Sequence, residues 1–394
     1  MLKTKQIIIF VIAILMVIIV SIFIVVQKSK GKVENQDKIE NDIEELDIEE
    51  TVNKELFEDY YSSAEEIMSK MTLEEKVGQM FLVRYPRTNS AIKQIKEQNP
   101  GGYVLFAVNF DNETIQSIKK ELENNQENSK IPMFFAVDEE GGKVVRVSSH
   151  SVFRKESFKS SQALYEEGGL EKIVEDSKEK SQLLKSIGLN MNLAPVADVS
   201  TSSSDFIYAR SFGKGAEETS AYIEKVIQAM NEEKILSSMK HFPGYGNNKD
   251  THTGIAIDKR PYETFTTSDF LPFEAGINVG APTIMVSHNI VESMDKNYPA
   301  SLSKDVHQIL REELNFSGLI ITDDLAMDAV KQYAENKKAA VQAVNAGNDM
   351  LISSNFEEEK KQVLDAIEKG EIEEETINIA VRRILACKLA YGIL

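Results

Sequence analysis

Residues 318–324 read GLIITDD, a continuous apolar run that ends in two aspartates and precedes a helix-like segment. Such a run is typical of a buried strand in a parallel sheet. Seven further runs of this kind occur between residue 80 and residue 353, with amphipathic stretches between them. The eight predicted strands cover 80–85, 102–106, 132–138, 189–196, 235–242, 283–288, 318–324 and 349–353. This alternation predicts an α/β fold, a (β/α)8 TIM-type barrel, with an open doubly wound sheet as the runner-up.

Ionisable side chains gather where these strands end. Six of them lie at or just past the carboxyl end of a predicted strand: Asp138, Asp198, His241, His288, Asp323 and Asp324. In a barrel these ends meet on the face that carries active sites. Because buried charges without partners are costly, we expect one pocket to hold these groups.

The segment 240–254, KHFPGYGNNKDTHTG, contains two of the five histidines of the chain, His241 and His252. Its Pro-Gly-x-Gly turn indicates a loop beyond a buried strand, where catalytic groups are common. Asp250 lies two positions before His252, so on an extended segment both side chains could face one side. We interpret this pair as a general acid/base with an orienting carboxylate. A solvated turn is one alternative, and metal ligation is another that no tight ligand spacing supports.

Asp323 lies at the rim of the predicted barrel, where it could act as a nucleophile, a metal ligand or a helix cap. Asp324 is the more natural cap for a helix beginning near Leu325, so Asp323 is the predicted nucleophile. A nucleophilic carboxylate with a separate acid/base is the arrangement for retaining glycoside hydrolysis. The side chains expected to hold sugar hydroxyls are Asp138, Arg210, Lys240 and His241.

The first 59 residues differ from the rest of the chain. Residues 7–26 are twenty consecutive uncharged positions, enough to cross a bilayer, and we expect segment 1–32 to be an uncleaved transmembrane anchor. A cleaved secretory signal and a lipoprotein signal are the alternatives, but no small-x-small cleavage pattern follows the apolar run and no cysteine lies near it. Residues 33–59 contain twelve Asp or Glu and two Lys, which predicts an extended acidic linker. The catalytic domain is then expected over residues 60–394.

The formal net charge of the chain is −18 at pH 7, so it is acidic overall. A nucleic-acid surface needs clustered cations, and we therefore expect no nucleic-acid partner. Cys387 is the single cysteine, which rules out an intramolecular disulfide and a thiolate zinc site, and its helical context predicts core packing. Thr72 and Glu75 have the spacing of a capping box at the start of a helix.

Six motifs, in order, resemble those of glycoside hydrolase family 3, and in particular its NagZ-type β-N-acetylglucosaminidases. The resemblance runs from MTLEEKVGQM (71–80) to the C-terminal RRILACKLAYGIL. The motifs are DEEGGKVVR (138–146), NLAPVADV (192–199), ARSFG (209–213), KHFPGYG (240–246), DTH (250–252) and ITDDLAM (321–327).

The resemblance implies a (β/α)8 barrel that needs no cofactor and no metal. It implies Asp323 as nucleophile, His252 as acid/base and Asp250 as its orienting partner. It further implies that N-acetylglucosamine is bound by Asp138, Arg210, Lys240 and His241. The implied reaction removes terminal β-1,4-linked N-acetylglucosamine from peptidoglycan fragments or other N-acetylglucosaminides. An anchored enzyme of this kind is expected at the cell membrane, with its catalytic domain outside and facing the wall.

Three departures from the family pattern affect the loop and its surroundings. Tyr245 stands where the family usually has His, Glu139 replaces Gln, and the stretch from Gly246 to Asp250 is one residue shorter than expected. The alternatives to hydrolysis of N-acetylglucosaminides are a phosphorylase or β-glucosidase of the same family and a catalytically inactive wall-binding module.

Overall fold

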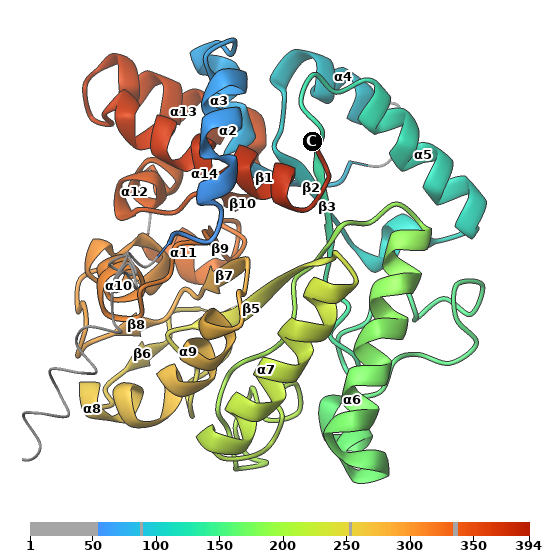
Figure 1. Cartoon of the computed structure of the whole chain (residues 1–394). Helices are drawn as coiled ribbons and strands as arrows, with labels where there is room; N and C mark the ends of the chain where they lie inside the picture. Colours follow the sequence, from blue (N-terminus) through green and yellow to red (C-terminus); the bar gives the residue numbers. More distant parts are fainter. Residues whose placement is uncertain (1–53, 87–89, 252–253, 334–337) are drawn as a thin grey trace, which may run out of the picture. The chain divides into compact units, whose positions relative to one another are not determined.

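Eight parallel strands form the centre of the computed structural model (Figure 1). They are β1 (Phe81–Arg84), β2 (Gly102–Leu105), β3 (Phe134–Val137), β4 (Met191–Asn192), β5 (Leu236–Phe242), β7 (Thr283–Val286), β9 (Leu319–Thr322) and β10 (Leu351–Ser353). All eight predicted strands are present, each somewhat shorter than predicted. Their hydrogen-bonded order is β10-β1-β2-β3-β4-β5-β7-β9.

The two ends of this sheet, β9 and β10, also meet. The Thr322 N–H donates to Met350 O at 3.1 Å, and the Met350 N–H donates to Ile320 O at the same distance. A parallel bridge joins Ile321 to Met350. The sheet therefore curls into a nearly closed barrel, which confirms the predicted TIM-type fold and removes the open-sheet alternative.

Helices follow the strands and cover the outside of the barrel (Figure 1). The α-helices are α2 (Tyr61–Met68), α3 (Leu73–Gln79), α4 (Ser90–Gln98), α5 (Ile115–Glu127), α6 (Ser161–Ser186), α7 (Ala216–Glu232), α8 (Tyr262–Thr264), α9 (Phe270–Asn278), α10 (Lys304–Gln308), α11 (Asp328–Tyr333), α12 (Ala339–Ala346), α13 (Phe356–Glu368) and α14 (Glu374–Ala390). Shorter 3-10 or π segments are η1 (Glu58–Tyr60), η2 (Ala107–Phe110), η4 (Phe265–Asp269), η5 (Ala300–Leu302) and η6 (Ile309–Glu313).

Local sequence explains two helix features. The predicted capping box is present, since Thr72 Oγ1 accepts from the Glu75 N–H and a Glu75 carboxylate oxygen accepts from the Thr72 N–H. α6 is interrupted at Gly168 and Gly169, where Gly169 has a φ of +66° that other residues rarely adopt.

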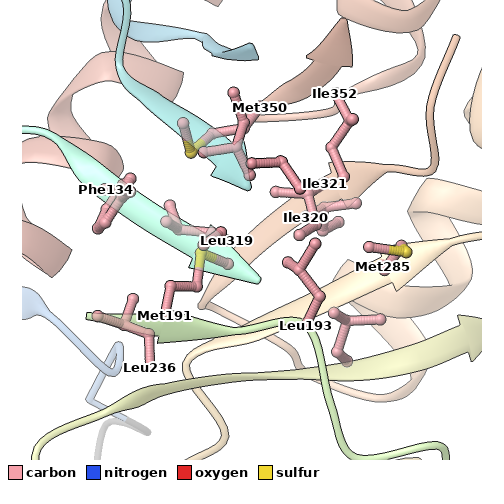
Figure 2. Packing of buried hydrophobic residues seen from close by; sticks show 14 of the residues in the cluster. Phe134, Met191, Leu193, Leu236, Met285, Leu319, Ile320, Ile321, Met350 and Ile352 are labelled. Carbon is pink, nitrogen blue, oxygen red and sulfur yellow. The ribbon is translucent and has the colours of Figure 1, made fainter. Parts of the chain in front are cut away.

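A single large apolar cluster fills the barrel and the layer between its strands and helices. Figure 2 shows its central part, in which side chains from β3, β4, β5, β7, β9 and β10 pack together. Cys387 is fully buried in the same cluster, which confirms the expected packing role. This core gives the loops above the strands a rigid base.

The structure describes residues 54–86, 90–251, 254–333 and 338–394. The predicted membrane span 7–26 and nearly all of the acidic linker lie outside these ranges. Within them, no helix combines the length and apolarity needed to span a bilayer. Residues from Glu55 onward form one unit with the barrel, and Phe57 is already buried.

One small sheet was not predicted. Strands β6 (Ile257–Asp258) and β8 (Ile290–Val291) pair in parallel outside the barrel. With only two residues each, they leave no periodicity for sequence reasoning to detect. They join the segment after β5 to the segment after β7, both at the carboxyl ends of strands.

Candidate active site

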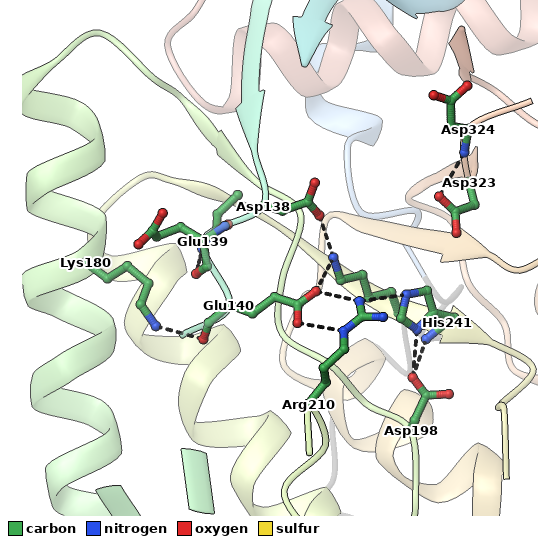
Figure 3. Close-up of polar contacts among 11 residues, drawn as sticks. Asp138, Glu139, Glu140, Lys180, Asp198, Arg210, His241, Asp323 and Asp324 are labelled. Carbon is green, nitrogen blue, oxygen red and sulfur yellow. Dashed lines mark hydrogen bonds and ion pairs between the residues drawn. The ribbon is translucent and has the colours of Figure 1, made fainter. Parts of the chain in front are cut away.

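The strand ends bring most of the predicted site residues to one face of the barrel (Figure 3). Asp138 follows β3, and Asp323 follows β9. Lys240 and His241 are among the last residues of β5. Arg210 arrives from the long loop between β4 and α7. These residues are far apart in the chain, and the parallel barrel brings them together because all its strands end on the same side.

An ion-pair cluster forms one side of this face. Lys240 Nζ lies 2.6 Å from Asp138 Oδ1 and 2.7 Å from Glu140 Oε1. Arg210 binds the same Glu140 with two nitrogens, Nε at 3.0 Å and Nη2 at 2.7 Å. The Lys240 and Glu140 side chains are only 2% and 4% exposed. A bidentate guanidinium and a shared ammonium thus fix Glu140 in one geometry.

Burial and pairing act against each other in this cluster. Burial alone would raise the pKa of Glu140, but the charges of Lys240 and Arg210 outweigh it and hold that pKa well below its usual range. Burial alone would lower the pKa of Lys240 and of Arg210, yet the neighbouring carboxylates raise both. All three groups are therefore charged at neutral pH.

Asp198 orients His241. His241 Nδ1 lies 2.8 Å from Asp198 Oδ2, and because an ionised carboxylate can only accept, Nδ1 carries the hydrogen. In the neutral ring, Nε2 is then an acceptor, and it lies 3.3 Å from Arg210 Nη2. The same carboxylate accepts from the backbone N–H of His241 at 3.0 Å and of Tyr245 at 2.7 Å. The loop after β5 is thus tied to the end of β4.

Consecutive residues of a regular strand point to opposite faces, yet Lys240 and His241 both belong to this cluster. The register between β5 and β7 shifts between Lys240 and Phe242, so one extra residue is inserted there. Such a bulge redirects side chains next to active sites.

Glu140 was missed by sequence reasoning, although it lies inside the quoted motif DEEGGKVVR. It is two positions after Asp138, so on an extended segment both side chains face the same side, and this spacing could have revealed it. The orienting role of Asp198 was also missed, because it depends on contact with a residue 43 positions away.

Asp323 and Asp324 lie opposite the ion-pair cluster in Figure 3, on the loop after β9. Asp324 Oδ1 accepts from the Ala326 N–H at 2.9 Å, and Oδ2 accepts from Ser354 Oγ at 2.8 Å. The prediction that Asp324 caps a helix beginning near Leu325 is wrong, because α11 begins at Asp328 and a turn lies between them. Asp324 instead stabilises that turn, and Asp323 Oδ1 accepts from the Asp324 N–H at 2.8 Å.

His288 serves the loop that carries Asp323. It is fully buried, with Nδ1 2.6 Å from Ser301 Oγ and Nε2 3.0 Å from the backbone oxygen of Asp324. Both ring nitrogens therefore contact the protein itself. Among the six strand-end groups, His288 and Asp324 thus form hydrogen bonds that hold the loop after β9.

His252, the predicted acid/base, lies outside the described residues. Asp250 is described and is half-buried. The residue between them, Thr251, is fully buried, and its hydroxyl forms a short hydrogen bond with the Tyr245 hydroxyl. Tyr245 packs edge-on against the His241 ring, with 5.0 Å between ring centroids. The tyrosine that departs from the family pattern thus connects His241 with the segment that leads to His252.

Glu139, the second departure, is a fully buried carboxylate. One oxygen accepts from the N–H groups of Arg146 and Val147, each at 2.7 Å. The other accepts from the N–H of Ser148 at 3.2 Å and from its hydroxyl. With donors on both oxygens, the site fits a carboxylate better than an amide, whose NH2 would face an N–H.

Within the described parts of the chain, no group of three or more His, Cys, Asp or Glu could hold a metal ion. The cluster carries its own cations, Lys240 and Arg210, close to its carboxylates. Such a face can bind a neutral polyhydroxylated molecule through donors and acceptors of fixed geometry.

Comparisons with known proteins agree with this geometry. Residues 72–387 match the family described as glycosyl hydrolase family 3 N terminal domain. A β-hexosaminidase of Idiomarina loihiensis is 32% identical over 277 residues, which cover 67% of this chain and 79% of that protein. β-Hexosaminidase A of Pseudoalteromonas piscicida is 28% identical over 322 residues, covering 75% of this chain and 54% of that protein. This chain thus spans about half the length of the second relative.

Among solved structures, a glycoside hydrolase family 3 β-N-acetylglucosaminidase from Paenibacillus sp. str. FPU-7 superimposes with a TM-score of 0.76 at 29% identity. The match covers 82% of this chain and 63% of that one. These findings confirm the resemblance carried by the motifs. The family match over residues 72–387, on a barrel with this charged face, shows that the chain belongs to glycosyl hydrolase family 3 and is a glycoside hydrolase related to the β-hexosaminidases.

Proposed function

We propose that this protein is a retaining exo-β-N-acetylglucosaminidase that works through a covalent glycosyl-aspartate intermediate. The observation that carries the proposal is the cluster of Asp138, Glu140, Lys240 and Arg210 on the same barrel face as Asp323. The β-hexosaminidases among its relatives support the choice of sugar.

The cluster suits one terminal sugar. Lys240 and Arg210 offer N–H donors, and Asp138 and Glu140 offer acceptors, so adjacent hydroxyls can be bound in pairs. Since Lys240 and Glu140 are buried and held by one another, they need little reorganisation when a sugar arrives. His241, fixed by Asp198, adds a ring nitrogen of defined protonation.

Asp323 is the proposed nucleophile. It lies next to Asp324, whose two carboxylate oxygens are committed to the turn and to Ser354. Attack by the Asp323 carboxylate on the anomeric carbon forms a glycosyl ester and releases the aglycone, and water then hydrolyses the ester. Both steps invert the anomeric centre, so its configuration is retained overall.

His252 is the proposed acid/base, with Asp250 as its orienting partner. A histidine in this role protonates the leaving oxygen in the first step and accepts the proton of water in the second. An imidazole without burial or pairing has a pKa near neutral pH, which suits this exchange of protons. The support for this assignment is the DTH motif and the spacing of its residues.

The experiment is covalent trapping with a fluorinated N-acetylglucosaminide, followed by mass spectrometry of the labelled peptide. The proposal expects the label on Asp323. Asp323→Asn should lower kcat on p-nitrophenyl N-acetyl-β-glucosaminide by on the order of 10³-fold or more. Asp324→Asn is the matched control and should lose much less. A label on another residue, or equal losses in the two variants, would reject Asp323 as the nucleophile.

The same assay separates the alternatives. Hydrolysis yields free N-acetylglucosamine with or without phosphate, whereas a phosphorylase yields the 1-phosphate and depends on phosphate. A β-glucosidase would prefer the glucoside, and an inactive wall-binding module would bind muropeptides without turnover. Each of these results would replace the proposed function.

We further propose that the substrate is a peptidoglycan fragment and that residues 7–26 anchor the enzyme with its barrel outside the cell. Twenty uncharged residues before an acidic linker support an anchor. Protease treatment of intact cells is expected to remove the barrel from a membrane-associated stub. A barrel protected from the protease would reject this orientation.

A further inference from the structure

Exposed apolar side chains gather around the face that carries the site. In the described parts of the chain, the large apolar residues classed as exposed are Leu56, Tyr60, Val108, Val152, Phe206, Ile255, Ile257 and Ile379. Five of these, from Val108 to Ile257, lie in the loops that follow β2, β3, β4 and β5. All four loops leave the strands on the side of the active site.

Phe206 is the aromatic member of this group, with 36% of its surface exposed. Its ring packs against Tyr245 with 5.7 Å between centroids and 63° between planes. Tyr245 in turn packs edge-on against His241, at 5.0 Å and 86°. Two successive ring contacts therefore connect the exposed phenyl ring to the histidine proposed to bind the terminal sugar.

The loop that carries Phe206 is held in place. Its neighbour Ile207 is fully buried and forms a small apolar cluster with Val196 and Tyr245. The Ile207 backbone oxygen accepts from the N–H groups of Arg210 and Ser211, each at 2.9 Å. Phe206 is thus held next to this small apolar cluster, four residues before Arg210, which binds Glu140.

We propose that the Phe206 ring is the platform of an aglycone subsite, which binds the sugar on the leaving-group side of the scissile bond. This inference rests on the proposed function and extends it to a second sugar. A pyranose ring has an apolar face of C–H groups, and a rigid exposed aromatic ring is the side chain that packs against such a face at little entropic cost.

The position of the ring agrees with this role. The terminal sugar is held by the charged cluster, where donors and acceptors are buried and paired. The next sugar leaves the site toward solvent, where hydroxyl groups can stay hydrated and only one face needs covering. Phe206 is only partly buried and offers apolar area without charge, as this position requires. Tyr245 contacts both Phe206 and His241, so a single ring separates the proposed platform from that histidine.

The test compares two substrates with the same N-acetylglucosamine. N,N′-diacetylchitobiose has a sugar aglycone, whereas the β-fluoride of N-acetylglucosamine has a leaving group too small to reach a platform. Phe206→Ala should lower kcat/KM for the disaccharide about fivefold, mainly through KM, because aromatic packing of this kind is worth about 1 kcal/mol. The loss for the fluoride should be much smaller, so the ratio of the two kcat/KM values changes.

Two further variants sharpen the test. Phe206→Tyr keeps an aromatic ring and should retain the wild-type ratio. Tyr60→Ala removes another exposed aromatic side chain, from η1, and should not change the ratio. A Phe206→Ala protein with an unchanged ratio, or one that loses activity equally on both substrates, would overturn the subsite.

Failure of the subsite can be told apart from failure of the proposed function. If the wild-type protein cleaves neither the fluoride nor the disaccharide, the proposed function fails. If it cleaves both and the ratio is insensitive to Phe206, only the subsite fails.

Discussion

The barrel contains a buried lysine at each end, and the two have opposite surroundings. Lys240, at the carboxyl ends of the strands, lies between Asp138 and Glu140. Lys388, on α14 at the amino ends, donates to Gln79 Oε1 at 2.7 Å and to the backbone oxygen of Gly101 at 3.1 Å. Both side chains are almost fully buried.

The difference shows what carboxylate partners do to a buried ammonium group. Burial lowers the pKa of Lys388 to about 7, since its hydrogen-bond partners there are neutral. The same burial acts on Lys240, but Asp138 and Glu140 reverse it and raise the pKa. The carboxyl end of the barrel thus keeps a fully charged lysine, and the amino end holds a lysine that is only partly charged at pH 7. This agrees with the division of a TIM barrel into a functional and a stabilising face.

The strongest test of this comparison is the same substitution at both ends. Lys240→Met should lower the free energy of unfolding by about 3–5 kcal/mol, because it removes the cation shared by the buried Glu140 side chain and the partly buried Asp138. It should also lower kcat/KM on p-nitrophenyl N-acetyl-β-glucosaminide by on the order of 10²-fold or more. Urea denaturation at pH 7 and steady-state kinetics would measure both effects.

Lys388→Met is the matched control for this substitution. It removes a lysine that is only partly charged at pH 7, so its cost should stay below about 2 kcal/mol, the range of two lost neutral hydrogen bonds. Its kinetic constants should remain close to wild type. Equal destabilisation by the two substitutions would mean that the carboxylates around Lys240 contribute no more than neutral partners do.

A second test concerns how the carboxylates near the site are held. Glu139→Gln should destabilise the protein by about 1–3 kcal/mol, because an amide NH2 would face donors that now point at a carboxylate oxygen. Thermal and urea unfolding would measure the change. The surface variant Glu123→Gln, which removes only an exposed pair with Lys119, should cost less than about 0.5 kcal/mol. A neutral Glu139→Gln would show that the site tolerates either group.

The smallest expected effect is a pH dependence at the amino-terminal end. The pKa of Lys388 is about 7 in the folded protein, below its ordinary value of 10.5. Between these values the unfolded chain binds more protons than the folded one, so folding becomes more favourable as the pH rises. Lys388 should contribute an increase of up to about 1.4 kcal/mol per pH unit above pH 7.

Urea denaturation at pH 7, 8 and 9 would detect this slope as a difference between wild type and Lys388→Met. The hydrogen bonds lost in the variant add a constant offset and leave the slope unaffected. The difference between wild type and Lys240→Met should stay nearly flat over the same range, since the pKa of Lys240 is raised. A flat difference for Lys388→Met as well would contradict the lowered pKa.

Much of the fold could be predicted because it follows from local patterns. Eight apolar runs became eight strands, and the capping box at Thr72 formed as its spacing indicated. The helix after Asp324 begins later than predicted, because Asp324 and Ser354 hold a turn there. Ser354 belongs to the next strand end along the chain, and no local pattern reveals such a partner.

The candidate site was predicted only in part for the same reason. Asp138, Arg210, Lys240 and His241 do meet on one face. Glu140 was not predicted because its role in the cluster depends on contacts with two cations, 70 and 100 positions further along the chain. The catalytic roles of Asp323, Asp250 and His252 remain predictions, and His252 lies outside the described residues.

The sequence by itself determined the order of strands and helices, since burial periodicity and capping act between near neighbours. It also determined the family, because six motifs that resemble those of the family occur in the chain in the same order. Tertiary structure alone decided which charges became partners: Lys240 with Asp138 and Glu140, His241 with Asp198, and Lys388 with only neutral groups. The physical reason is that the energy of a buried charge depends on what lies within a few ångströms in space, and distance along the chain does not set that.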